Sequence, residues 1–339
     1  MIAKRVGRVV LALILMSVVF VAAGTSVANA QTCDKTSSVN MSNLDTKPAN
    51  ITITAYKADG TVDGTPFSDT IAVGEGAAYF PIPGISAGFS GALVVSSDAS
   101  VAAIANIVCT NFSAGGSYVA GTTGATTVNL PVLNKGNGGF TTTFSVQNTA
   151  SEVATVNVSY TDGTSVNDVK IPPNAAAVFD QATENHPQKN FAGTVTSDKP
   201  VVASALQESS SIIFSYLAFS TSGTPKPLFP LVNINNAGYV TAIQIQNGGN
   251  QSTDVTVSYT PSGTDGTACT ETQTIPAGSA KNFTLNVFSG NPAGITTSCI
   301  NKEKFVGSAV VSANSADQPL IGIINQLGST DGEAYGSFS

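Results

Sequence analysis

Short runs in which apolar and polar residues alternate recur along the whole chain. The run Val156-Asn-Val-Ser-Tyr160 has valine or tyrosine at every second position, and it returns as Val255-Thr-Val-Ser-Tyr259. A fainter copy is Ile51-Thr-Ile-Thr-Ala55. Successive side chains of a strand point to opposite faces, so a period of two is typical of a strand with one buried face. Each run therefore predicts a half-buried β-strand.

The runs belong to longer segments that occur three times, about 100 residues apart, a spacing typical of modules. Phe144-Ser-Val-Gln-Asn148 precedes the run of the second copy, and Ile243-Gln-Ile-Gln-Asn247 precedes that of the third. Glycine-containing turn signals follow each run, at Asp59-Gly60, Asp162-Gly163 and Ser262-Gly263. Residues that recur at equivalent positions are most simply read as framework, which leaves few places for a unique chemistry.

A later shared segment begins with Phe-x-Gly at Phe89, Phe191 and Phe305. A turn is expected in the middle of this segment, at Asp98, Asp198-Lys-Pro200 and Asp317-Gln-Pro319. A last strand closes each copy, at Ser117-Tyr-Val-Ala120, Ser215-Tyr-Leu-Ala218 and Ala334-Tyr-Gly-Ser337.

About seven short strands per copy, with no amphipathic helix, predict an all-β chain of three tandem antiparallel β-sandwich modules of immunoglobulin- or fibronectin-like type. We expect a signal peptide at residues 1–30 and modules at 31–121, 122–222 and 223–339. The first copy lacks an equivalent of the leading strands Leu130-Pro-Val132 and Leu231-Val232, so it resembles a truncated or capping module. Pro131 and Pro230 are expected at short, semi-rigid junctions.

Residues 1–30 have the three parts of a secretory signal. Lys4, Arg5 and Arg8 form a basic start, an apolar stretch of about 16 residues follows, and Ala28-Asn-Ala30 fits the cleavage pattern. The mature chain is expected to begin at Gln31 and to have no membrane span. An uncleaved N-terminal anchor is the alternative.

Removing the signal takes three of the 14 basic residues and none of the 21 acidic ones, which leaves 11 against 21 and a formal net charge of −10. The mature chain also contains no arginine. It therefore lacks the bidentate guanidinium that recognises phosphates and base edges, and an acidic chain gains nothing from counterion release. Nucleic acid is excluded as a partner on these grounds.

Four cysteines remain after export, which makes disulfides plausible. Cys33 and Cys109 bracket the first copy, whereas Cys269 and Cys299 lie in segments that the second copy lacks. We expect the pairs Cys33–Cys109 and Cys269–Cys299 among the three possible pairings. No C-x-x-C spacing suggests a metal site.

Two residues invite a catalytic interpretation. Gly84-Ile-Ser86-Ala-Gly88 matches the G-x-S-x-G nucleophile pattern, but it precedes a strand where a hydrolase needs a helix. The only histidine, His186, lies in another copy, in the polar context Asn185-His-Pro187, and is expected to be an exposed loop residue. We therefore predict no catalytic residue, no cofactor and no enzyme activity.

Aspartates near the predicted turns offer a second kind of site, since carboxylates are calcium ligands. They lie beside glycines at hairpin positions and form no dense D-x-D-x-D run, so a turn role is favoured and calcium is kept as the alternative. The aspartates are Asp59, Asp63, Asp69, Asp162 and Asp168. Carbohydrate sites use aromatic faces, and the chain contains no tryptophan.

The order of the motifs L-P-x-x-x-N, a Q-N strand end, V-x-V-S-Y, I-P-x-[NG] and F-x-G-x-x-x-x-S-D-x-P resembles a group of secreted, largely uncharacterised bacterial β-sandwich repeat proteins. More loosely, the modules resemble adhesion-related, fibronectin-like surface modules. This resemblance implies fold and location, and it brings no catalytic residues.

We therefore expect a secreted, non-enzymatic structural or adhesive protein of the bacterial cell surface, acting as a spacer, coat or filament subunit. Its partners would be copies of itself, other surface proteins or polysaccharide. One hypothesis joins the chain end Ala334-Tyr-Gly-Ser-Phe338 to the incomplete first module of the next copy, giving head-to-tail filaments. The alternatives are an extracellular glycan- or ligand-binding protein and, through Ser86, a hydrolase.

Overall fold

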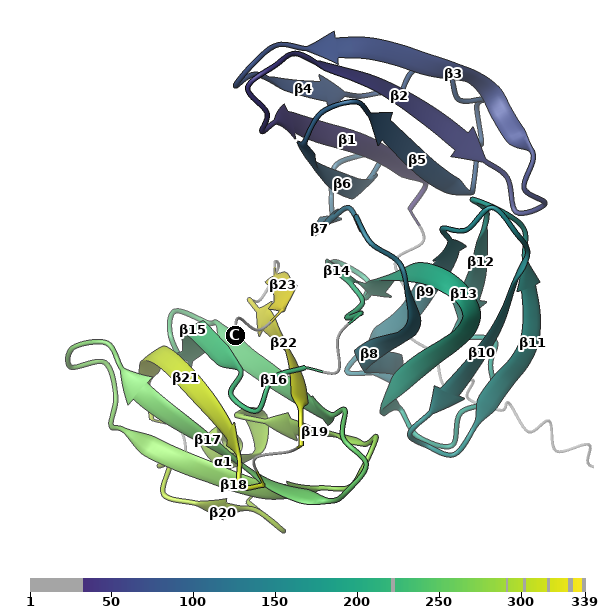
Figure 1. The fold of residues 1–339 in the computed structure, drawn as a ribbon. Helices are drawn as coiled ribbons and strands as arrows, with labels where there is room; N and C mark the ends of the chain where they lie inside the picture. The colour runs from purple at the N-terminus through teal and green to yellow at the C-terminus, as the bar shows by residue number, and fades with distance from the viewer. Residues whose placement is uncertain are drawn as a thin grey trace, which may run out of the picture.

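The computed structural model describes residues 33–220, 223–290, 292–300, 303–315, 318–328 and 332–336. Within these residues the regular secondary structure is almost entirely β-strand, arranged in five antiparallel sheets. The sheets form three groups along the chain, which we call the first, second and third units (Figure 1). The expected all-β antiparallel fold is confirmed.

Each unit is formed by consecutive strands. The first unit contains β1 (Lys35–Asn43), β2 (Ala49–Tyr56), β3 (Val62–Ile71), β4 (Gly76–Tyr79), β5 (Ala92–Ser97), β6 (Val101–Cys109) and β7 (Gly115–Val119). The second contains β8 (Ala125–Asn137), β9 (Phe140–Asn148), β10 (Ala154–Tyr160), β11 (Ser165–Ile171), β12 (Ala176–Asp180), β13 (Asn190–Glu208) and β14 (Ile213–Leu217). The third contains β15 (Leu228–Ile234), β16 (Val240–Asn247), β17 (Thr253–Pro261), β18 (Cys269–Ile275), β19 (Ala280–Phe283), α1 (Leu285–Ser289), β20 (Thr296–Thr297), β21 (Phe305–Ala313), β22 (Leu320–Leu327) and β23 (Gly332–Gly336).

The strand order repeats from unit to unit. The first unit pairs β4-β1-β6-β7 and β3-β2-β5, and the third pairs β19-β16-β22-β23 and β15-β21-β17-β18-β20. In the second unit the equivalent strands form one seven-stranded sheet, because the long β13 pairs with both halves. The turn expected at Asp198-Lys-Pro200 does not interrupt this strand and only shifts its register between Thr196 and Val201.

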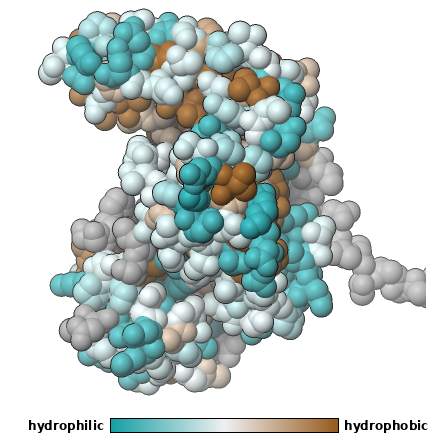
Figure 2. Space-filling view, turned by 45° about the vertical axis from the view of Figure 1, so that its right-hand side comes forward, coloured by the Kyte–Doolittle hydropathy of each residue, from teal (hydrophilic) through white to brown (hydrophobic). Residues whose placement is uncertain are grey.

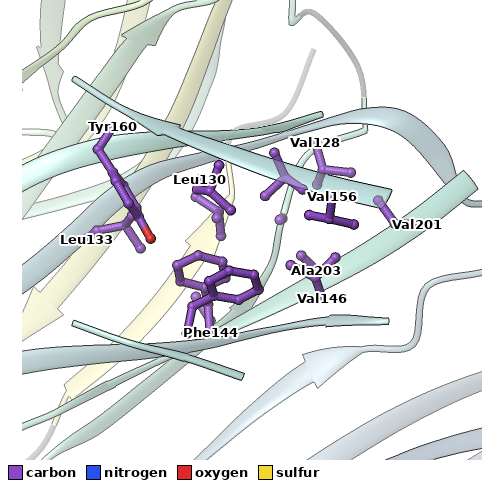
Figure 3. Packing of buried hydrophobic residues seen from close by; sticks show 14 of the residues in the cluster. Val128, Leu130, Leu133, Phe144, Val146, Val156, Tyr160, Val201 and Ala203 are labelled. Atoms are coloured by element: carbon purple, nitrogen blue, oxygen red, sulfur yellow. The ribbon is translucent and has the colours of Figure 1, made fainter. Parts of the chain in front are cut away.

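The alternating runs bury the expected faces. Val156, Val158 and Tyr160 are at most 5% exposed, as are their counterparts in β2 and β17. Each unit has its own cluster of buried apolar side chains. In the second unit, Val128 and Leu130 from β8 lie in the same interior as Phe144 from β9 (Figure 3). The leading strand is therefore part of this core.

The turns have the predicted backbone chemistry. Gly60, Gly163 and Gly263 have φ of 85°, 91° and 63°, a left-handed conformation that favours glycine. The following hairpin turns use Asn174 at 62° and Gly278 at 66°. Equivalent turns thus recur in backbone geometry as well as in sequence.

A buried asparagine at the end of the first core strand recurs in all three units. The Nδ2 of Asn148 donates to the carbonyls of Glu152, Ile171 and Pro172, and its Oδ1 accepts from the Ala150 amide at 2.9 Å. Asn43 and Asn247 make the corresponding bonds in their own units. The asparagine ties together the backbones of two loops, which explains the recurrent Q-N strand end.

Pro131 and Pro230 are not in the junctions, contrary to expectation. They lie inside β8 and β15, where the pairing with β13 and β21 shifts register. Proline has no amide hydrogen, so a strand accepts it where the ladder is already interrupted. The short helix α1 was also not predicted.

The first unit has no leading strand within the described residues, as expected, and β5 is the last strand of its sheet. At the other end of the chain, the backbone of β23 pairs with β22 of its own unit. The head-to-tail hypothesis took this strand as a donor to another copy; in the structure it has one partner in its own unit and is the last strand of that sheet.

The expected signal peptide (1–30), the Asp317 part of the third turn and residues 337–339 lie outside the described residues. Among the residues that the structure describes, no helix has the length and apolar character needed to cross a membrane.

Candidate functional site

The cysteines pair as expected, Cys33 with Cys109 and Cys269 with Cys299. The first bond ties the start of β1 to the end of β6, and the second ties β18 to the segment that follows β20. Two disulfides are compatible with an extracellular protein.

His186 is not an exposed loop residue, contrary to expectation. Its side chain is 1% exposed, and its ring stacks on Phe191 at 4.1 Å between centroids. Its Nδ1 lies 2.9 Å from Oδ2 of Asp162, and Thr164 Oγ1 lies 3.0 Å from the same nitrogen. Polar neighbours in sequence suggested a loop, but the Asp162 turn closes over the ring. The ring lies between Phe191 and the Asp162 turn, in a packed corner of the second unit.

Ser86 lies on an exposed loop between β4 and β5, with no helix after it. Its amide donates to Oδ2 of Asp63 at 2.8 Å, and His186 belongs to another unit. The elbow geometry of a hydrolase nucleophile is therefore not present around Ser86.

Two of the candidate calcium ligands, Asp59 and Asp162, cap their own turns, whereas Asp63 accepts from the Ser86 amide and Asp69 from the Tyr79 hydroxyl. Oδ1 of Asp59 accepts from the amide and hydroxyl of Thr61, and Asp162 does the same with Thr164. Burial raises the pKa of Asp162, but hydrogen bonds from Thr164 and His186 outweigh it and hold the pKa below its usual value. Within the described residues, no group of three or more histidine, cysteine or acidic side chains is placed to hold a metal.

A buried carboxyl group lies in the third unit, where Glu271 is 0% exposed. Its Oε2 accepts from the Tyr259 hydroxyl at 2.8 Å and from the Thr284 amide at 2.9 Å, and its Oε1 accepts from Gln273. Burial raises the pKa of Glu271, and these hydrogen bonds offset the effect only in part. Burial and the nearby carboxyl raise the pKa of Tyr259 as well. A buried carboxyl with a raised pKa links the stability of the surrounding unit to pH.

We expect the third unit to lose stability as pH rises from about 4.5 through the raised pKa of Glu271. In that window the folded state binds more protons than the unfolded chain, so the free energy of unfolding falls with increasing pH. Urea unfolding of wild-type and Glu271→Gln protein between pH 4 and 8 measures this. The free energy of unfolding of the wild-type protein should fall relative to that of the variant as pH rises. A difference between the two that stays constant would contradict a raised pKa of Glu271.

Polar side chains connect the second and third units. Asn190 of β13 donates through Nδ2 to Gln244 Oε1 of β16 at 3.3 Å, and Asn282 of β19 donates to Asn190 at 3.1 Å. Within the second unit, the same Asn190 Nδ2 also donates to Asn134 Oδ1 at 2.9 Å. Asn325 of β22 donates to Gln207 of β13 at 3.1 Å. These amides are half-buried or buried, so their bonds fix the position of one unit against the other.

Apolar and ionic contacts strengthen the junctions. Ile323 of the third unit is 1% exposed and belongs to the core cluster of the second unit. Between the first and second units, Lys35 Nζ lies 2.9 Å from Glu208 Oε1. The last strands β7, β14 and β23 approach one another at the centre of the arrangement (Figure 1). The three units therefore form a connected framework.

A shallow depression with aromatic walls lies on the first unit. Phe80 and Phe112 are 51% and 70% exposed, and their rings meet edge to face at 6.2 Å. Phe112 has φ of 56° in the turn after Cys109, so the disulfide anchors the segment that presents this ring. The depression is lined by Ser38, Phe80, Asn106, Val108, Phe112, Gly115, Gly116 and Ser117.

A polar row crosses the floor of this depression. Asn106 of β6 donates to Ser38 Oγ of β1 at 2.9 Å, and it accepts from Ser117 Oγ of β7 at 2.7 Å. Exposed aromatic rings beside amide and hydroxyl groups are the combination that binds sugar rings and other flat, hydroxylated ligands. This is the candidate site that the geometry favours.

Sequence reasoning did not find this site. From the sequence, only tryptophan was considered as an aromatic platform, whereas Phe80 is a phenylalanine that does not recur in the other copies. By strand register, the position of Phe80 is Asp180 in the second unit and Thr284 in the third. An aromatic residue in one copy at a position where the other copies have polar residues is the sequence signal that could have identified this depression.

The first unit is also the most apolar on its surface. Seven of the twelve exposed large apolar residues of the described chain lie in it. Figure 2 shows hydrophobic residues gathered on the upper, first unit, whereas the lower unit is mainly polar on this face. Contact with other molecules is therefore expected at the first unit.

Comparison with protein-family models, with curated proteins and with solved structures finds no match to this chain. Its function is therefore argued from its own residues.

Proposed function

We propose that this chain is a secreted, non-enzymatic structural or adhesive protein of the bacterial cell surface. Three tandem immunoglobulin- or fibronectin-like β-sandwich modules would form its framework. The observation that carries this proposal is the connection between the second and third units through side-chain amide hydrogen bonds and the buried Ile323. Modules that act independently can be joined by flexible linkers and need no contacts with one another. A spacer or coat protein must hold its shape, and contacts between modules provide that rigidity.

The location is tested on intact producing cells. Labelling with a membrane-impermeant reagent should mark the protein, whose N-terminus should be Gln31 and whose four cysteines should resist thiol alkylation. An intracellular protein with reactive thiols would overturn the proposal, because both disulfides would then be absent.

A second candidate function, extracellular glycan or ligand binding, is favoured by the depression between Phe80 and Phe112. It fits an adhesive role, since the site lies on the unit with the most exposed apolar surface. Bacterial and host polysaccharides are the ligands to test on a glycan array.

We expect Phe112→Ala to weaken binding of any glycan that the array identifies by about tenfold, because it removes the more exposed aromatic surface. Val178→Ala is the matched control, since Val178 is 62% exposed on β12 of the second unit. Equal affinity of both variants would exclude this depression as the glycan site.

A further inference from the structure

The first unit has an open strand edge where the other two units are closed. In the second unit β8 pairs with β13, and in the third β15 pairs with β21. The strand of the first unit that corresponds to β13 and β21 is β5. In the described residues β5 pairs only with β2, so no leading strand covers its other edge.

Register defines the equivalent positions along this edge. Val95 lies opposite Ile53, as Val195 lies opposite Val158 in the second unit. Val195 faces Val128 of the leading strand on its other side. On the corresponding side of Val95, no described strand pairs with β5.

The third unit shows which backbone groups the edge offers. The amides of Val311 and Ala313 donate to the carbonyls of Pro227 and Pro225, at 2.9 and 3.1 Å. By register with β17 and β2, these two positions correspond to Val95 and Ser97 in the first unit. Edge amides without a partner strand are a template for another strand.

The core beneath the open edge is incompletely covered. Three residues of β6 are half-buried, whereas their counterparts in β13 are at most 2% exposed. The pairs are Val101 and Val201, Ala103 and Ala203, and Ala105 and Ala205, matched by the register of β6 with β1 and of β13 with β9.

A tyrosine gives an independent indication of the missing strand. Tyr216 of the second unit is buried, and its hydroxyl donates to the carbonyl of Val132 in the leading strand at 2.6 Å. Tyr118 takes the same register position in the first unit, opposite Ala105, and is only half-buried. The acceptor of its counterpart lies in the leading strand of the second unit, and the described residues of the first unit include no such strand.

We propose that the edge of β5 captures an extended strand from another polypeptide chain. The strand would run antiparallel to β5, with apolar side chains alternating as Val128 and Leu130 do, and one of its carbonyls would accept from Tyr118. The second unit approaches the start of this edge, where Gln147 donates to the Leu93 carbonyl at 3.4 Å. The edge is distinct from the Phe80 depression, so strand capture holds whether or not that depression binds glycans.

The probe is a fluorescent peptide with the sequence of residues 124–137, the leading strand of the second unit. We expect saturable one-to-one binding to the mature protein (residues 31–339), measured by fluorescence anisotropy. A control peptide with aspartate in place of Val128 and Leu130 should bind at least tenfold more weakly, because charged groups cannot enter the core. Absence of saturable binding, or equal binding of the control peptide, would overturn the proposal.

Two protein variants locate the binding edge. Ser97→Pro removes an edge amide that does not pair with β2, and it should abolish peptide binding while the protein keeps its circular dichroism spectrum. Tyr118→Phe should weaken binding about fivefold through loss of one hydrogen bond, with unfolding of the free protein unchanged. Unaltered affinity of both would place the peptide elsewhere and refute capture at β5. A dimer of the free protein that the peptide dissociates would support capture and identify a second copy as the donor.

Discussion

Asn148→Ala is expected to lower the free energy of unfolding of the second unit by about 3 kcal/mol. The substitution leaves three carbonyls without their donor and the Ala150 amide without its acceptor, at a side chain that is 0% exposed. Unpaired buried polar groups cost more than an average hydrogen bond contributes. Hydrogen exchange of β9 and β10 in the native protein measures the effect, and protection should fall roughly a hundredfold.

Asn167→Ala is the matched control. Asn167 is an exposed residue of the same unit, and its side chain bonds only to Ser165 Oγ. Its loss should cost less than about 0.5 kcal/mol. A cost below about 1 kcal/mol for Asn148→Ala would mean that the recurrent asparagine does not hold the two loops together.

Removing the Cys33–Cys109 bond should destabilise the first unit by about 4 kcal/mol, since the bond closes a loop across a separation of 76 residues. The double variant Cys33→Ala/Cys109→Ala provides the test, with hydrogen exchange of β1 and β6 as the measurement. The second unit contains no cysteine and serves as the internal control. Equal loss of protection in both units would show that the framework unfolds as one body, and unchanged protection in the first unit would show that the bond is dispensable.

The sequence predicted those features of the fold that depend on local pattern. Alternation identified the core faces of β10 and β17, and glycine or asparagine identified the left-handed turns. Comparison of the repeats led to the disulfide pairs, because each pair lies within one unit. Each of these signals can be read from neighbouring residues or from comparison of the repeats, without knowledge of tertiary contacts.

Features that depend on tertiary contact were missed. His186 is surrounded by polar residues in sequence, and only the approach of Asp162 and Phe191 buries it. Pro131 lies within a strand because the register shift of β13 accommodates it, and no local signal announces that shift.

The binding surfaces were the least predictable part. Phe80 and Phe112 are 32 positions apart in the printed sequence, and they meet because one follows β4 and the other follows β6. The open edge of β5 was anticipated only as a missing leading strand. Comparison of the three units by register shows that the amides of β5, the half-buried core residues of β6 and Tyr118 lack the strand that covers their counterparts.

The central claim is that three units form one fixed framework. Small-angle X-ray scattering of residues 31–339, with negative-stain microscopy of the same sample across protein and calcium concentrations, tests it most directly. Particles with three lobes in one constant, curved arrangement, unchanged by calcium, are the expected result. Lobes at variable distances and angles, as in beads on a flexible chain, would contradict the claim, because the amide contacts between units would then not hold in solution.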